Sequence, residues 1–84
     1  MRQLEFLITN EEGLHARPIS LLVKSAQKYE SEIYLYFGNS RANLKSLFDA
    51  MGLCVKKNSL VRIEVEGEDE NEAAEQIESL MQEL

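Results

Sequence analysis

The sequence predicts an α+β domain in which one face of a β-sheet is covered by helices. Four segments alternate apolar and polar residues with the two-residue period of strands, and three segments repeat apolar residues at helical spacing. Their order along the chain is β-α-β-β-α-β-α. Alternating strands leave one sheet face to water, so the helices must cover the other face. Eighty-four residues, of which 44% are hydrophobic, suit a single domain over residues 1–84.

The first strand and the first helix lie on either side of a polar loop. Apolar residues at every second position predict a strand over about residues 2–9. Pro18 lacks a backbone N–H and has a fixed φ, which suits the first turn of a helix. We therefore expect a helix that begins within residues 16–18 and continues to Tyr29.

The middle of the chain combines a hairpin with a short helix. Alternation returns in a second strand over residues 33–37. Gly38-Asn39-Ser40 is typical of a hairpin turn, and it predicts a short third strand near residues 40–44. Ser46 has the position of an N-cap for a short helix that ends near Gly52.

The end of the chain adds the fourth strand and the last helix. Residues 60–66 alternate apolar and charged side chains, which predicts a strand with one exposed face. Asp69 and Glu72 have the spacing of a capping box just before the last helix. That helix carries its apolar residues on one stripe, namely Ala73, Ile77, Leu80, Met81 and Leu84.

Composition and charge exclude several classes of function. The chain has 15 acidic and 9 basic residues, and the net charge of −6 argues against nucleic acids and anionic membranes as partners. A single cysteine, Cys54, and a single histidine form neither an internal disulfide nor a metal cluster. We expect Cys54 to be a small buried side chain without a redox role. No apolar run could span a bilayer and no signal peptide opens the chain, so we expect a cytoplasmic protein.

The most informative segment is Gly13-Leu14-His15-Ala16-Arg17-Pro18-Ile19-Ser20, which places the only histidine at the expected helix start. The unpaired N–H groups and the positive dipole end of the helix favour a neutral, nucleophilic ring. The N–H groups of Ala16 and Arg17 would bind the oxygens of a phosphoryl group on His15. The Arg17 side chain would add a charged hydrogen bond. Spacing alone also fits a histidine and an arginine that only cap a helix.

Two segments resemble motifs of one known family. Residues 13–20 resemble the active-centre motif of the HPr family, the histidine-containing phosphocarriers of the bacterial phosphoenolpyruvate-dependent sugar phosphotransferase system. Asn43-Leu44-Lys45-Ser46 resembles the segment around the regulatory serine of HPr from Gram-positive-type bacteria, and the interval from His15 to Ser46 also fits. The resemblance covers essentially the whole chain. It implies an open-faced sandwich, with a four-stranded antiparallel sheet and three helices on one face.

The same resemblance implies a function for the histidine. His15 would accept a phosphoryl group at Nδ1 from phosphorylated enzyme I and pass it to enzyme IIA domains for sugar uptake. Arg17 would stabilise the transferring group. The chain would be a carrier rather than an enzyme, with no cofactor and no metal. We expect a monomer, because a carrier must release each partner quickly.

Ser46 carries a second hypothesis. The resemblance implies phosphorylation there by an ATP-dependent HPr kinase/phosphorylase, which weakens transfer to His15 and creates a binding form for a catabolite-control transcription regulator. Asp49 and Cys54 stand where glycine is frequent in the family. Asp49 would repel a phosphate on Ser46, and Cys54 occupies a turn that favours glycine. The alternative role of Ser46 is an N-cap worth about 1 kcal/mol.

The candidate partner-binding residues are Leu14, Leu47, Phe48 and Met51. We expect them to form a small exposed apolar patch beside the active centre, although a core position would suit Leu47 and Met51 equally. Two other functions stay open at this point. One is a regulatory HPr paralogue that acts through Ser46 on a transcription regulator, and the other is a generic interaction module. Regulatory paralogues of this kind lack the active histidine, which this chain retains.

Overall fold

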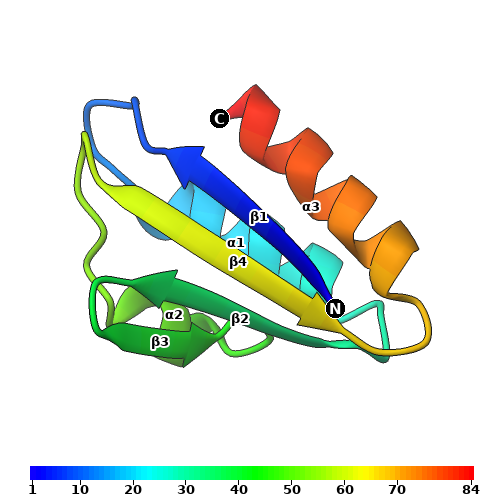
Figure 1. Ribbon diagram of the computed structural model, residues 1–84. Coiled ribbons are helices and arrows are strands. Elements are labelled where there is room, and N and C mark those ends of the chain that lie inside the picture. Colours follow the sequence, from blue (N-terminus) through cyan, green and yellow to red (C-terminus); the bar gives the residue numbers. More distant parts are fainter.

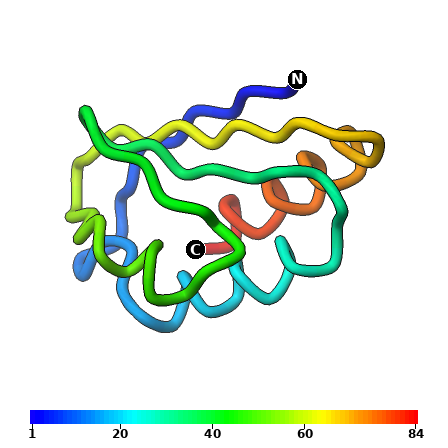
Figure 2. The backbone as a smooth tube through the Cα atoms, turned by 90° about the horizontal axis from the view of Figure 1, so that it is seen from below, coloured from blue at the N-terminus to red at the C-terminus, as the bar shows by residue number.

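The computed structural model describes residues 1–84 and confirms the predicted order of the elements. The elements are β1 (Arg2–Leu7), α1 (Ala16–Ala26), β2 (Glu32–Phe37), β3 (Ser40–Asn43), α2 (Leu47–Met51), β4 (Leu60–Glu66) and α3 (Glu70–Glu83). The strands form one sheet in the order β1-β4-β2-β3, and every neighbouring pair is antiparallel (Figure 1). The helices lie together below the sheet in Figure 2, so the α+β open-faced sandwich is confirmed.

A single hydrophobic core fills the space between the sheet and the helices. Alternate residues of β4 point into it: Val61, Ile63 and Val65 are buried, as the alternation predicts. Full burial of a side chain such as Ile63 contributes roughly 1.5–3 kcal/mol. The largest fully buried side chains include Ile19, Leu22, Ile33, Leu35, Leu44, Ile63 and Ile77.

The other face of the sheet carries stacked aromatic and arginine side chains. The Arg62 guanidinium carbon lies 4.5 Å from the centre of the Tyr36 ring, and that of Arg41 lies 4.4 Å from the centre of the Tyr34 ring. Such cation–π contacts contribute about 0.5–1 kcal/mol at exposed sites. The uncovered face is therefore polar, which explains why no helix covers it.

The strands keep their predicted positions within two residues, but α1 is shorter than expected. It ends at Ala26, with Gln27 as its C-cap, instead of continuing to Tyr29. The N–H groups of Lys28 and Tyr29 donate to the carbonyls of Ser25 and Ala26 at 3.1 and 3.2 Å. These bonds span three residues instead of four and tighten the chain into turns.

The capping box predicted for α3 is wrong. Asp69 is the N-cap residue, but its side chain makes no capping hydrogen bond. Its carboxylate instead accepts hydrogen bonds from the backbone N–H groups of Glu30 and Ser31, in the loop between α1 and β2. The Glu70 carboxylate accepts the Gly67 N–H at 3.1 Å. The capping spacing was present, but a tertiary contact drew the Asp69 carboxylate away from its own helix.

The apolar stripe predicted for α3 is confirmed. Ala73, Ile77 and Met81 are buried, while Leu80 and Leu84 pack partly buried against the same core. None of the three helices combines the length and the apolar character that crossing a bilayer requires.

Candidate functional site

His15 is the N-cap residue of α1. Its backbone is extended, with φ −86° and ψ −171°, and its carbonyl accepts the Ile19 N–H at 3.1 Å, the first hydrogen bond of the helix. The side chain makes no capping hydrogen bond and is partly exposed. The favoured N-cap side chains accept an orphan N–H of the first turn, and the His15 side chain does not. The imidazole ring is instead left free for chemistry.

Two backbone N–H groups beside His15 also lack a protein partner. Ala16 and Arg17 occupy the first two helical positions, both are exposed, and neither N–H group donates to a protein acceptor. Pro18 follows at the third position, where it has no N–H to satisfy. The helix dipole adds positive potential at this end. The start of α1 therefore offers two free donors to an anion held on the histidine ring.

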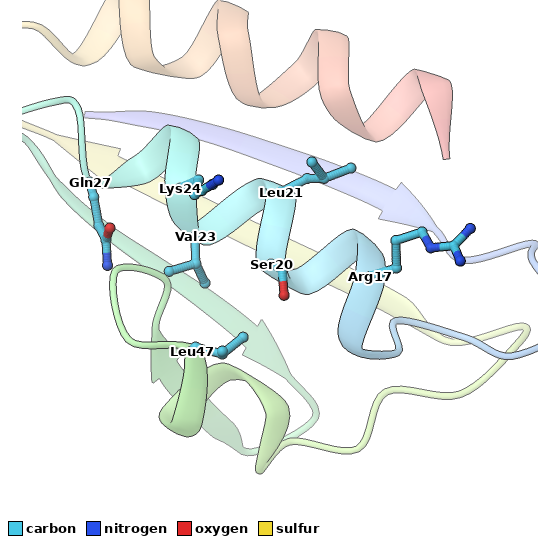
Figure 3. Close-up of a pocket in the computed structure, with 7 residues that line it drawn as sticks. All are labelled: Arg17, Ser20, Leu21, Val23, Lys24, Gln27 and Leu47. Carbon is cyan, nitrogen blue, oxygen red and sulfur yellow. The ribbon is translucent and has the colours of Figure 1, made fainter.

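Arg17 is exposed at the same helix end. In Figure 3 its side chain leaves the start of α1 and points away from Leu47. The guanidinium makes no hydrogen bond or ion pair with another residue. It is thus available for a bidentate contact with phosphoryl oxygens.

A groove of about 560 Å³ begins at Arg17 and runs between α1 and α2. Figure 3 shows Val23 of α1 and Leu47 of α2 facing each other across it. Its lining residues on α1 and at the C-cap of this helix recur at helical spacing, and this periodicity is visible in the sequence. They are Arg17, Ser20, Leu21, Val23, Lys24 and Gln27.

The predicted apolar patch is present only in part. Leu47, Phe48 and Met51 of α2 are 43%, 91% and 42% exposed. Leu14 is different, because it is only 5% exposed and belongs to the core. Its place in the exposed patch is therefore a wrong prediction. The loop that carries His15 must be anchored to the domain, and Leu14 provides that anchor.

Ser46 is the N-cap of α2, as predicted. Its Oγ accepts the Asp49 N–H at 3.2 Å, and its carbonyl accepts the Ala50 N–H at 3.0 Å. The Asp49 carboxylate accepts the Asn43 N–H at 2.8 Å. Asp49 thus donates its N–H to Ser46 itself and binds the chain before Ser46, at Asn43, through its carboxylate.

Cys54 is exposed and lies in a turn with φ of +53°. The expected burial of its side chain is therefore wrong, whereas the expected demand of this turn for glycine-like backbone freedom is right. No three His, Cys, Asp or Glu side chains lie close enough together to hold a metal ion.

Comparisons with known proteins agree with this geometry. A family model described as "PTS HPr component phosphorylation site" matches residues 3–83. The histidine-containing phosphocarrier protein of a Mycoplasma is 33% identical, with a TM-score of 0.95 over 98% of this chain and 93% of that one. HPr from Thermoanaerobacter tengcongensis is 36% identical, with a TM-score of 0.91 over 98% of this chain and 92% of that one.

A third similar structure is Crh, a catabolite-repression protein of Bacillus subtilis described as a domain-swapped dimer. It is 34% identical, with a TM-score of 0.76 over 99% of this chain and 95% of that one. The match of the family model over nearly the whole sequence is the decisive finding. The chain belongs to the HPr family of phosphocarrier proteins.

Proposed function

We propose that this chain carries a phosphoryl group on His15 in the cytoplasm, between phosphorylated enzyme I and enzyme IIA domains. The observation that supports the proposal most directly is the N-cap position of His15, with a side chain that is not used for capping. A ring nitrogen, Nδ1 by the family resemblance, attacks phosphorus as the bond from phosphorus to the donor breaks. Transfer to an enzyme IIA domain repeats the exchange in the opposite sense.

The surroundings of His15 supply positioning and charge stabilisation. The N–H groups of Ala16 and Arg17 and the Arg17 guanidinium stabilise the negative charge on the equatorial oxygens of the transferring group. No general base is needed if the ring is neutral when it attacks. The chain receives the group and gives it up unchanged, so it acts as a carrier and not as an enzyme.

The test is intact-mass analysis after incubation with enzyme I and phosphoenolpyruvate. The native chain is expected to gain one acid-labile phosphoryl group, and His15→Ala is expected to gain none. A Glu75→Gln variant, which changes an exposed residue of α3 and keeps the histidine, serves as a control for nonspecific effects of substitution. Absence of the modification from the native chain, with an enzyme I that phosphorylates another HPr, would refute the proposal.

We also propose that Ser46 is a site of regulatory phosphorylation, because a serine at a helix N-terminus accommodates a dianion without disturbing the fold. Similarity to Crh favours this second role, and with it the alternative of a purely regulatory paralogue. Incubation with ATP and an HPr kinase/phosphorylase, compared with Ser46→Ala, tests it. A modified chain that still takes a phosphoryl group on His15, but more slowly, supports both roles together. Binding of the modified chain to a catabolite-control transcription regulator tests the last step.

The interaction face we propose is formed by Leu47, Phe48 and Met51, with Leu14 supporting the loop from within. Enzyme I and the enzyme IIA domains would bind there in turn. A monomer in solution stays a prediction, since dimeric structures of both Crh and a Thermoanaerobacter tengcongensis HPr are known. Light scattering during size-exclusion chromatography measures the mass directly.

A further inference from the structure

The loop that carries His15 rests on a distant part of the chain. We call residues 53–59, between α2 and β4, the support segment. Leu14, the residue directly before His15, donates its backbone N–H to the Val55 carbonyl at 3.0 Å. Because Leu14 and Val55 are both buried, this bond is shielded from water. The peptide that leads into His15 is therefore held by the support segment.

The other end of the same loop is held in the same way. The Ile8 N–H donates to the Ser59 carbonyl at 2.9 Å, and the Ile8 carbonyl accepts the Asn58 N–H at 2.7 Å. Between these two ends, the Lys57 ammonium lies 2.6 Å from the Glu11 carboxylate. This ion pair is exposed and contributes little on its own. The loop is thus bonded to the support segment at both ends.

Gly13 is the point of closest approach between the loop and the support segment. A Cβ atom at residue 13 would lie 2.3 Å from the Val55 carbonyl oxygen and 2.8 Å from the Cα of Lys56. Both atoms belong to the backbone, so neither can swing aside as the end of a flexible side chain can. Any side chain at this position pushes the loop off its support.

We propose that the support segment positions His15 for phosphoryl transfer, with the Gly13 contact and the Leu14–Val55 hydrogen bond as the positioning elements. This inference rests on the proposed carrier function. In-line transfer needs the attacking nitrogen within a fraction of an ångström of its place, and misplacement by about 1 Å costs up to about 100-fold in rate. The start of α1 fixes the residues after His15, and the support segment fixes those before it.

Gly38 provides a matched control for Gly13. Both glycines have positive φ, +68° for Gly13 and +60° for Gly38, so an alanine meets a similar backbone cost at either position. A Cβ atom at Gly38 meets nothing within 4 Å. The comparison of Gly13→Ala with Gly38→Ala therefore isolates the contact with the support segment from the general cost of a side chain at positive φ.

The measurement is single-turnover transfer from saturating phosphorylated enzyme I, corrected for the folded fraction of each variant. Gly13→Ala is expected to slow transfer roughly 10- to 100-fold, while Gly38→Ala stays close to the native chain. Affinity for unphosphorylated enzyme I is expected to be equal in both variants, because the faces of α1 and α2 are unchanged. Hydrogen exchange at the Leu14 amide is expected to be faster in Gly13→Ala alone.

A second variant keeps the test valid if Gly13→Ala does not fold. The chain can be assembled by chemical ligation of a synthetic peptide of residues 1–53 to a peptide of residues 54–84 at Cys54. This allows the change Leu14→leucic acid, which replaces the backbone N–H of Leu14 by an ester oxygen and keeps the side chain. Transfer by this variant is expected to slow as well. Equal transfer rates for the native chain and for the variants that fold would overturn the positioning role of the support segment and leave the carrier function intact. Failure of the native chain to accept a phosphoryl group overturns the carrier function itself, and with it this inference.

Discussion

The carboxylate of Asp69 accepts two hydrogen bonds from Ser31, one from its backbone N–H at 3.0 Å and one from its hydroxyl group. A third comes from the Glu30 N–H at 2.9 Å. Ser31 is 1% exposed, so this contact is shielded from water. It holds the loop after α1 against the start of α3. The hydroxyl of Ser31, followed by the N–H of Glu30, holds the pKa of Asp69 below its ordinary value of 3.8, because these donors favour the charged form.

The contact predicts a pH dependence of stability. Because the pKa of Asp69 is lower in the folded chain than in the unfolded chain, its contribution is complete above about pH 5 and is lost as the pH falls through the lowered value. Asp69→Asn is expected to be less stable at neutral pH and to lose less stability on acidification. Urea unfolding between about pH 2 and pH 7 measures this. Glu68→Gln, an exposed neighbour, is the control, and equal pH slopes in the native chain and Asp69→Asn would contradict the prediction.

Arg17→Ala is expected to slow phosphoryl transfer roughly 10- to 100-fold, because it removes a charged donor from the transferring group. Arg17→Lys keeps the charge but loses the bidentate geometry. Its transfer rate is therefore expected to lie between those of the native chain and Arg17→Ala. Lys24→Ala, a change in the lining of the same groove but away from His15, controls for charge on that face. Single-turnover transfer kinetics give the three rates. Equal rates for Arg17→Ala and Lys24→Ala would remove Arg17 from the mechanism.

Phe48→Ala is expected to weaken binding of enzyme I roughly tenfold without loss of stability. The ring is 91% exposed, so its removal leaves no cavity in the core. Leu60→Ala is the matched control, because Leu60 is 59% exposed but lies on the uncovered face of the sheet. Calorimetric titration with enzyme I and thermal unfolding of each variant separate docking from folding. Similar affinities for both variants would show that the patch on α2 is not the docking face.

Cys54→Gly is expected to raise the free energy of unfolding by up to about 1 kcal/mol. A non-glycine residue in the left-handed region costs about 1–2 kcal/mol, and the greater freedom of glycine in the unfolded chain offsets part of the gain. Asn58→Gly is the control, since Asn58 also has a positive φ of +71° but asparagine tolerates it better. Urea denaturation measures the change in the free energy of unfolding for both variants. A stabilisation by Asn58→Gly as large as that by Cys54→Gly would argue against relief of strain at residue 54.

Local patterns predicted most of the fold because each acts over a few residues. Alternation located β4 at Leu60–Glu66, and Pro18 placed the start of α1 within residues 16–18, where the helix begins at Ala16. The capping role of Ser46 also followed from its position alone. The antiparallel arrangement of the sheet came only from the family resemblance, since periodicity does not say which strands pair.

Two of the errors share a physical cause, which is that tertiary contacts override local preference. Asp69 has a good partner in Ser31, so it leaves its own helix uncapped. Leu14 lies in a polar loop but is drawn into the core. The support of the His15 loop by Val55 could not be predicted from the sequence, because 40 residues lie between Leu14 and its acceptor. Only Gly13 carried a signal of close approach.

The position of β4 between β1 and β2 has a consequence for how the molecule is made. The strand that joins the two halves of the sheet is the last strand of the chain, and β1 pairs with no other. During synthesis the histidine motif emerges early, long before the residues that pair with β1. Pairing over so great a separation along the chain is a slow step of folding. A chain interrupted before Leu60 therefore contains His15, the proposed phosphoryl acceptor, but lacks the strand that completes the sheet. We expect that only nearly complete molecules take part in phosphoryl transfer.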